Sequence, residues 1–416
     1  MKALGHNLIQ EYPMRSNKQE SAILIGVQRR GVPIWEVNDN IDELEQLAIT
    51  AGATIEARVI QDRGKPSPAT FIGKGKVGEV RDYIYHTDAN LVIFDDDLSP
   101  AQGRNLEKML GCKIIDRSGL ILDIFAQRAN TMEARIQVEL AQLQYLRPRL
   151  TRAWGHLGRQ EGGIGMRGPG ETQLEVDRRV ITRRMTKLKK SLKKIEKSRI
   201  TRRSGRRNIF KVGLIGYTNA GKSTILNALT KSEVLVENKL FATLDPTVRS
   251  LRLPEGRKVL LIDTVGFIRK LPVGLLASFR STLEESKTAD LFLNVIDLSH
   301  PHWEGQLSRT EEIIKELELD KKPQVLLFNK VDKVDDQTLL EGLTNQFPEA
   351  IFLSALRGIR LWDVLTKIEE FATREWVRGS RSFYPDQDED LKDFESQVKV
   401  IGRLFKDGKI VVDYLV

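Results

Sequence analysis

The chain has 416 residues, of which 40% are hydrophobic and 30% are charged, and its net charge is +9. Two or three domains fit this length, and no stretch approaches the roughly 18 uncharged apolar residues that span a membrane, so we expect neither membrane insertion nor a secretory signal. The single cysteine, Cys112, excludes an internal disulfide and a cysteine metal cluster, and it fits a protein of the reducing cytoplasm.

Residues 1–20 are polar and without pattern, which predicts a mobile tail. The next part, residues 21–128, predicts an α/β domain with a mostly parallel sheet, because strand and helix patterns alternate. The expected strands are 22–27, 55–60 and 91–94, and the expected helices are 42–51 and 77–85. Residues 73–76 (Gly-Lys-Gly-Lys) resemble a phosphate loop only superficially. No long strand precedes them and the terminal hydroxyl is missing, so we assign them no nucleotide.

Residues 129–207 predict a long antiparallel helical hairpin. The first helix, at 131–146, places Ile136, Leu140 and Leu143 on one stripe and should end before Pro148. The second helix, at 172–203, has apolar side chains at heptad spacing, which predicts pairing with the first helix. These side chains are Leu174, Ile181, Met185, Leu188, Leu192 and Ile195.

Between the two helices, residues 155–170 contain seven glycines in sixteen positions, together with Arg159 and Arg167. Glycine allows a partner's surface to approach the backbone closely, so we expect a binding tip, with a flexible linker as the alternative. Trp154 nearby either stacks on a base or packs against the protein.

The second helix is strongly basic. Residues 178–207 hold fifteen Lys or Arg and one acidic residue, Glu196, a net +14 that leaves −5 for the rest of the chain. Nucleic acid, an anionic membrane or an acidic protein would suit such a charge. A membrane-surface helix would need a broad apolar face, whereas this one has a narrow seam already used in pairing, so we predict RNA.

Residues 208–375 predict a doubly wound GTPase domain. Gly216-Tyr217-Thr218-Asn219-Ala220-Gly221-Lys222-Ser223 follows a buried strand and forms a complete phosphate-binding loop, or P-loop. Lys222 is expected to reach the β- and γ-phosphates, and the Ser223 hydroxyl is expected to bind Mg²⁺. A hairpin at the sheet edge is expected from residues 248–253 and 258–263.

Asn329-Lys330-Val331-Asp332 specifies guanine, because a carboxylate accepts from the N1–H and the amine of guanine and adenine lacks that donor pair. A weaker motif, 354–356, is expected to contact the guanine oxygen. The full predicted nucleotide-binding set is Gly216, Tyr217, Thr218, Asn219, Ala220, Gly221, Lys222, Ser223, Thr224, Asp263, Gly266, Asn329, Lys330, Asp332, Ser354, Ala355 and Leu356.

The residues that should sense Mg²⁺ and the γ-phosphate lie between these motifs. Asp263 is expected to bind the metal through water, Gly266 to meet the γ-phosphate, and Thr243, with Thr247 as second choice, to bind the metal directly. Phe267 stands where many small GTPases have a water-orienting glutamine, so no catalytic residue is identified and intrinsic hydrolysis should be slow. Asn219 suggests a monovalent cation, K⁺, beside the phosphates.

Residues 376–416 form a small C-terminal module. Leu391 and Phe394 indicate a helix, and Asp407-Gly408 between two apolar runs indicates a hairpin with a type I′ turn. A small α+β domain and a packed extension are both compatible with this pattern.

The most specific run in this chain is Gly-Gly-Ile-Gly-Met-Arg-Gly-Pro-Gly-Glu-Thr-Gln at 162–173, followed by Asp177-Arg178-Arg179. Together with residues 116–128, 138–146 and 263–272, it resembles the HflX family of ribosome-associated GTPases. Glu161 departs from the pattern, since a small residue is expected there, and the C-terminal module matches weakly.

The resemblance implies a factor that binds the large ribosomal subunit and its RNA, with the tip reaching toward the peptidyl-transferase region, and splits ribosomes into subunits in a GTP-dependent manner. Two alternatives remain open: a GTPase of large-subunit assembly, and an RNA-binding protein for which GTP is a structural ligand. The residues assigned to ribosomal RNA are Arg159, Gly163, Arg167, Gly168, Gly170, Arg178, Arg179, Arg183 and Arg184.

Overall fold

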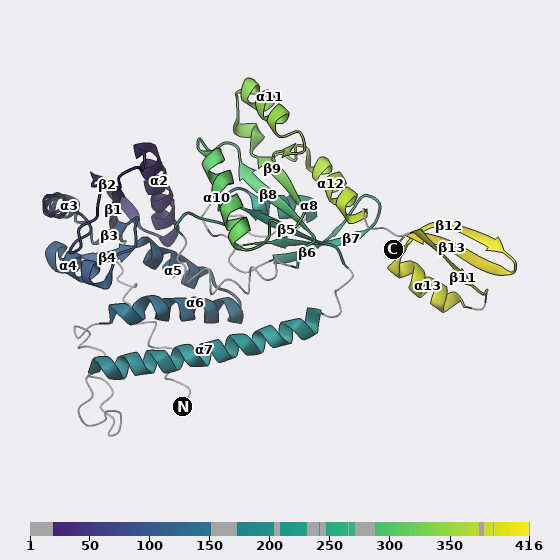
Figure 1. Ribbon diagram of the computed structural model, residues 1–416, viewed down its shortest axis with the longest axis horizontal. Helices are drawn as coiled ribbons and strands as arrows, with labels where there is room; N and C mark the ends of the chain where they lie inside the picture. The colour runs from purple at the N-terminus through teal and green to yellow at the C-terminus, as the bar shows by residue number, and fades with distance from the viewer. Residues whose placement is uncertain are drawn as a thin grey trace. The chain divides into compact units, whose positions relative to one another are not determined.

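The computed structural model describes residues 20–150, 173–203, 209–230, 241, 247–264, 266–270, 288–373, 378–385 and 387–415 (Figure 1). They divide into two compact units. Unit 1 comprises Met1–Gly205, Leu235–Pro246 and Val265–Glu284, and unit 2 comprises Arg206–Val234, Thr247–Thr264 and Glu285–Val416. Residues 1–19 of the predicted tail (1–20), the tip at 155–170 and Thr243 lie outside the described residues.

Unit 1 contains a four-stranded parallel sheet in the order β2-β1-β3-β4. Its strands are β1 (Ser21–Gln28), β2 (Thr54–Asp62), β3 (Leu91–Phe94) and β4 (Lys113–Asp116). Its helices are α2 (Ile34–Ala51), α3 (Lys74–Thr87), α4 (Pro100–Leu110) and α5 (Arg117–Arg128). The three predicted strands and two predicted helices are confirmed, although α2 begins eight residues before position 42. Strand β4 and helices α4 and α5 had no counterpart among the predicted elements.

Both faces of this sheet are covered by helices, because successive side chains of a strand point to opposite faces. Leu24 of β1 packs in one core with side chains of α2 and α5, such as Leu44 and Phe125. Its neighbour Ile25 packs in a second core with side chains of α3 and α4, such as Val80 and Leu106.

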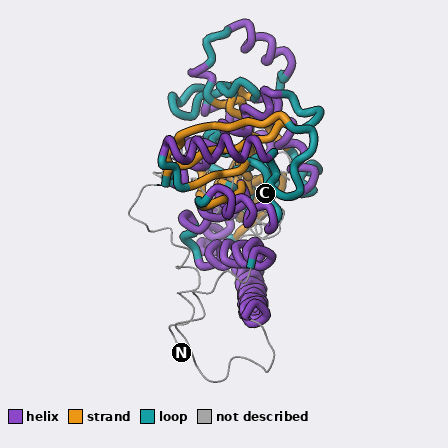
Figure 2. The backbone as a smooth tube through the Cα atoms, turned by 90° about the vertical axis from the view of Figure 1, so that its left-hand side faces the viewer, coloured by secondary structure: helices purple, strands orange, loops and turns teal. Residues whose placement is uncertain are grey.

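The hairpin helices lie side by side (Figure 1). Helix α6 (Met132–Leu146) continues into a short 3₁₀ turn, η1 (Arg147–Arg149), and α7 (Gln173–Arg203) runs back along it as a straight rod, seen almost end-on in Figure 2. The predicted seam is confirmed, because Met185 and Leu188 are buried against Leu140 and Leu143. The α-helix ends at Leu146, before Pro148 as predicted, and the proline is accommodated within the short 3₁₀ turn that follows.

Unit 2 contains a six-stranded sheet in the order β10-β9-β8-β5-β7-β6, parallel except for the edge strand β6. The strands are β5 (Lys211–Gly216), β6 (Thr247–Arg252), β7 (Lys258–Asp263), β8 (Leu291–Asp297), β9 (Gln324–Asn329) and β10 (Ile351–Phe352). The described helices are α8 (Lys222–Thr230), α10 (Trp303–Glu316), η3 (Val331–Lys333), α11 (Gln337–Gln346) and α12 (Leu361–Thr373). The doubly wound fold and the edge hairpin are as predicted.

The C-terminal module is a small α+β fold. Its three antiparallel strands are β11 (Arg378–Phe383), β12 (Lys399–Lys406) and β13 (Lys409–Leu415), and its helix is α13 (Asp388–Gln397). Asp407 and Gly408 have φ values of 52° and 74°, as a type I′ turn requires. Within the described parts of the chain, no helix is long and apolar enough to cross a membrane.

Candidate nucleotide-binding site

The P-loop connects β5 to α8 at the carboxyl end of the parallel strands, where open α/β sheets bind ligands. Gly216 and Gly221 have φ values of 142° and 97°, which only glycine adopts without strain. A Cβ at Gly216 would lie 2.2 Å from the Val295 carbonyl oxygen, and a Cβ at Gly221 would lie 2.2 Å from the Asn329 side-chain nitrogen. Both glycines are therefore required by close packing as well as by backbone angle.

Lys222 is buried and its ammonium group bends back over the loop. Its Nζ donates to the carbonyl oxygens of Gly216 at 3.1 Å and Tyr217 at 2.7 Å. Burial lowers the pKa of Lys222 to about 8, and the charge of Asp263 opposes this shift. Because burial destabilises the charged ammonium group, an anion bound beside Lys222 would stabilise it, so the loop is suited to phosphate. The buried Thr218 hydroxyl, which has no hydrogen-bond partner among the described residues, is a further polar group inside this loop.

Ser223 and Asp263 are brought together by the pairing of β5 with β7. The Ser223 hydroxyl donates to Asp263 Oδ2 at 2.6 Å, and Asp263 is fully buried. A hydroxyl and a carboxylate are oxygen ligands of the kind that Mg²⁺ prefers. The two residues therefore fit a magnesium ion beside the phosphates.

The guanine motif is tied to the P-loop by Asn329. Its amide donates to the Ala220 carbonyl at 2.8 Å and its oxygen accepts from the Ala355 backbone N–H at 3.0 Å. One buried side chain thus joins the three loops that the sequence predicted to share a ligand. Asp332, in η3, is exposed, so its carboxylate is available to an incoming base.

Lys330 has a partner that sequence reasoning missed. Its ammonium group pairs with Asp297 Oδ2 at 2.6 Å, and Asp297 is the last residue of β8. The signal was present, since a carboxylate that ends a buried strand also identified Asp263. Lys330 has a φ of 64°, and this ion pair holds its side chain against the end of β8.

Gly266, the predicted γ-phosphate contact, and its neighbour Phe267 belong to unit 1, and Phe267 is only 5% exposed. The contact of Gly266 with the phosphate stays a prediction. Position 267 lacks the water-orienting glutamine, and the phenylalanine that replaces it is buried. In the last predicted motif, Ser354 is fully buried, Leu356 is 74% exposed, and the Ala355 backbone N–H donates to Asn329 of the guanine motif.

The described part of the predicted RNA-binding set lies on α7. Arg178, Arg179 and Arg183 are exposed. Arg184 instead donates to Glu139 through two nitrogens, at 2.5 and 2.8 Å, so it fastens α7 to α6. Arg159, Gly163, Arg167, Gly168 and Gly170 lie outside the described residues.

This sheet and its three loops define a P-loop GTPase. A GTPase HflX from Flavobacterium psychrophilum is 48% identical over 77% of this chain and 77% of its own length, and one from Caldanaerobacter subterraneus subsp. tengcongensis is 43% identical over 95% and 90%. The chain belongs to the HflX family of GTPases.

Three family models also match the chain. They are described as the N-terminal region of a GTP-binding GTPase (residues 38–126), its middle region (128–206) and a 50S ribosome-binding GTPase (211–330). Among solved structures, a GTP-binding protein from the archaeon Sulfolobus solfataricus in complex with GDP is 25% identical, with a TM-score of 0.45, over 85% of this chain and 99% of that one.

Proposed function

We propose that this GTPase binds the large ribosomal subunit through the α6–α7 hairpin and uses GTP to separate ribosomes into subunits, with hydrolysis stimulated by the ribosome. The observation that supports this most is the exposed basic surface of α7. Met185 and Leu188 are used in packing against α6, so the remaining faces offer charge and little apolar area. Phosphate contacts from such a surface dominate the affinity for RNA.

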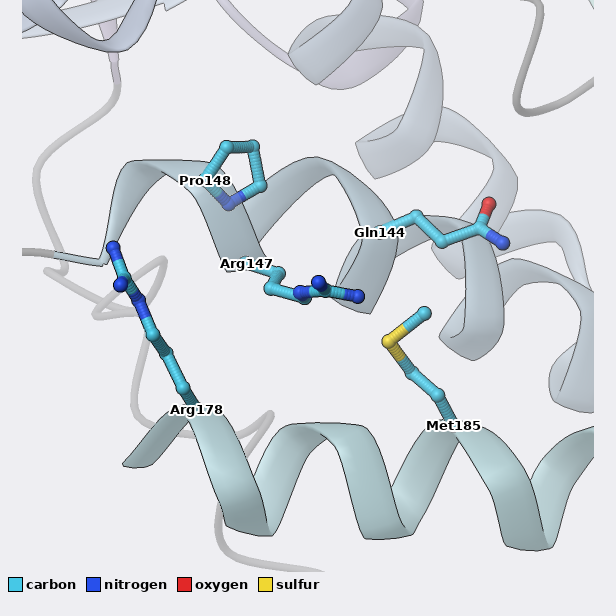
Figure 3. A pocket seen from close by; sticks show the side chains of 5 residues that line it. All are labelled: Gln144, Arg147, Pro148, Arg178 and Met185. Atoms are coloured by element: carbon cyan, nitrogen blue, oxygen red, sulfur yellow. The ribbon is translucent and has the colours of Figure 1, made fainter. Parts of the chain in front are cut away.

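A pocket of about 380 Å³ opens where the end of α6 meets the beginning of α7 (Figure 3). Arg147 and Arg178 line it from the two helices, together with Gln144, Pro148 and Met185. Neither guanidinium has an acidic partner within the described residues. Two arginine forks on either side of one opening suit a backbone phosphate of RNA. This supports the hairpin as the RNA-binding element.

In the proposed reaction, this chain's residues bind and orient GTP. The P-loop amides and Lys222 hold the phosphates, Asn329 joins the loops, and Asp332 selects guanine. Ser223 and Asp263 would hold Mg²⁺, which when bound neutralises charge that develops on the phosphates. Phe267 cannot orient water, so a group on the ribosome is expected to complete the hydrolytic site.

A K⁺ ion held beside Asn219 is a second way to supply that missing charge. Asn219 is exposed at the P-loop surface with a φ of 61°. If K⁺ contributes, turnover measured in potassium will exceed turnover in sodium at equal ionic strength. Equal rates in both salts would remove K⁺ from the mechanism.

Sedimentation of intact ribosomes in sucrose gradients, with the full chain and a non-hydrolysable GTP analogue, tests the function. We expect intact particles to convert into subunits at stoichiometric protein. Intact particles that survive would refute splitting, and preferential binding to immature large subunits would favour the assembly alternative. If ribosomes leave GTP turnover unchanged, the ribosome-stimulated reaction is wrong.

A charge-reversal pair tests the basic surface. Lys187→Glu/Lys190→Glu, both exposed on α7, should weaken large-subunit binding at least tenfold at about 100 mM salt, since phosphate contacts are lost. Lys315→Glu/Lys321→Glu makes the same change of charge at exposed positions of unit 2 and should bind as the wild type does. Equal losses in both pairs would show only a general charge effect.

A further inference from the structure

The carboxyl ends of β8 and β9 carry one charged group that the nucleotide-binding motifs do not include. Asp297 ends β8 and lies opposite Asn329 in the parallel pairing of the two strands (Figure 1). The Leu298 backbone N–H donates to the Asn329 carbonyl at 3.0 Å, so hydrogen bonding continues just past the last strand residues. Asp297 therefore lies at the ligand-binding edge of the sheet, next to the guanine motif.

Both carboxylate oxygens of Asp297 accept hydrogen bonds. Oδ2 accepts from Lys330 Nζ at 2.6 Å, and Oδ1 accepts from the Ser299 hydroxyl at 2.6 Å and from the Ser299 backbone N–H at 3.1 Å. The Asp297 side chain is 14% exposed and the Lys330 side chain is 20% exposed, so solvent screens this ion pair less than it screens an exposed one. Because Ser299 holds one oxygen, the other faces Lys330 in a fixed direction.

The backbone of Lys330 is held as well. Its φ of 64° lies in the left-handed region, which bulky residues adopt only where their surroundings impose it. The next residue, Val331, donates its N–H to the Leu353 carbonyl at 3.3 Å, and the Lys330 carbonyl accepts from the Lys333 N–H at 3.0 Å. With both its backbone and its ammonium group held, the stem of Lys330 runs from the beginning of η3 to the end of β8.

A lysine stem that is ordered in advance favours binding of a flat ligand. A free lysine side chain has many rotamers, and a base that packs on its stem must select one of them. Ordering one such side chain during binding lowers the affinity by up to about tenfold. Here the ion pair with Asp297 orders Lys330 before a nucleotide arrives, so this loss is avoided.

We propose that Asp297 is a positioning residue for guanine-nucleotide binding, which holds the Lys330 stem along the carboxyl ends of β8 and β9 where the base packs on it. This role rests on the predicted contact of Lys330 with the base and is independent of the ribosome. Asp297 acts at the base end of the nucleotide, whereas Lys222 and Ser223 act at the phosphates. It therefore raises the affinity for GTP and GDP by the same factor and leaves the turnover of bound GTP unchanged.

The first test measures nucleotide affinity and GTP turnover by the full chain without ribosomes. Asp297→Asn keeps an acceptor for Ser299 and removes the ionic partner of Lys330. We expect the Kd values for GDP and for a non-hydrolysable GTP analogue to rise together by about fivefold, within the range for ordering one side chain, and kcat to change less than about twofold. Asp297→Glu keeps the charge and should recover part of the affinity. A wild-type Kd in Asp297→Asn, or a kcat that falls as far as the affinity, would overturn the positioning role.

A double-mutant cycle with Lys330→Ala distinguishes positioning from a general disturbance of the loop. Lys330→Ala removes the stem and should weaken nucleotide binding by itself. Asp297→Asn added to it should weaken binding no further, because Asp297 acts only through Lys330. A further loss equal to that of the single variant would show that Asp297 acts by another route and would overturn the role. An unchanged affinity in Lys330→Ala would overturn the base contact on which the role rests.

Asp320→Asn is the matched control. It makes the same chemical change at an exposed carboxylate in the loop before β9 and should bind GDP as the wild type does. Thermal unfolding without nucleotide identifies a variant that does not fold. If that variant is Asp297→Asn, Lys330→Met takes its place, since it keeps an apolar stem and removes the same ion pair, and it should show the same loss of affinity. Wild-type GDP binding by Lys330→Met would then overturn the positioning role.

Discussion

The two parallel sheets of this protein end their strands with similar residues but use them differently. In unit 1, Asp95 and Asp116 at the ends of β3 and β4 are met by arginine and lysine side chains of the same chain. In unit 2, Asp263 and Asn329 at the ends of β7 and β9 face a glycine-rich loop. The carboxyl edge of a doubly wound sheet is a general place for ligands, and here one edge binds the chain's own cations while the other is shaped for a nucleotide.

The difference lies in backbone geometry more than in charge. Gly216 and Gly221 let the P-loop backbone curl with positive φ, so that N–H groups converge on one point. At the other edge the donors are side chains, and Arg117 already forms ion pairs with Asp95 and Glu43. An edge whose carboxylates are paired in this way stabilises the fold, whereas an edge of converging amides binds an anion.

The largest expected effect distinguishes Lys222 of the P-loop from Lys74, which also follows a glycine. Lys222→Ala should lower kcat by about 10²–10³ and abolish tight GTP binding, because a preorganised charge on the phosphates is lost. Lys74→Ala, at an exposed residue of the superficially similar 73–76 loop, should change neither. Nucleotide affinity by fluorescence titration and turnover by phosphate release measure both. A comparable loss in Lys74→Ala would show that unit 1 also binds nucleotide.

The next effect concerns backbone shape. Gly221→Ala should destabilise unit 2 by about 2 kcal/mol or more and weaken GDP binding, because its Cβ would displace the Asn329 amide that donates to Ala220. Gly103→Ala, in α4 with nothing within 4 Å of the added Cβ, should instead stabilise unit 1 by about 0.5–1 kcal/mol. Denaturant unfolding measures both changes. Equal effects at the two sites would mean that packing at Gly221 relaxes easily.

Much of this comparison could be predicted from the sequence. Local patterns specified the P-loop, the guanine motif and the seam of α7, because each depends on residues a few positions apart. Helix α5 was missed since its buried side is broad, with Leu120, Ile121 and Leu122 in succession all buried, so that it lacks the narrow apolar stripe that marks a surface helix. It is buried between the sheet and α6, and this tertiary packing cannot be deduced from the local sequence.

The contacts of Lys270 with Asp95 and Asp96 were beyond sequence reasoning for a different reason. Lys270 and Asp96 are 174 positions apart, and nothing in either local run indicates the other. Residues 266–270 were assigned to the GTPase domain by their neighbours in sequence, whereas they pack in unit 1. The assignments of nucleotide and RNA roles to individual residues stay predictions, and so do the domain boundaries.

The smallest expected effect tests whether every buried carboxylate of unit 1 is stabilised by a nearby cation. Asp123, on α5, is an exception to the paired carboxylates: burial raises its pKa to about 6, the nearby Lys113 opposes this shift and Glu20 adds to it. Because the folded pKa lies above the usual value of 3.8, folding favours the protonated form. Stability is therefore lost as pH rises from about 4 to about 6, and the loss is complete above that range.

Asp123→Asn removes this penalty, since the amide is neutral at every pH. We expect the variant to be more stable than the wild type at pH 7, by at most about 3 kcal/mol, and the gain to shrink at pH 5 and vanish near pH 4. Thermal unfolding across this range measures the difference. A gain that is constant with pH would mean that the amide stabilises by packing or hydrogen bonding, and that Asp123 is as well satisfied as the paired carboxylates Asp95 and Asp116. A gain that follows pH would show that unit 1 tolerates a buried acid about two helix turns beyond the end of β4, where the described residues form no ion pair with it like that of Arg149 with Asp116.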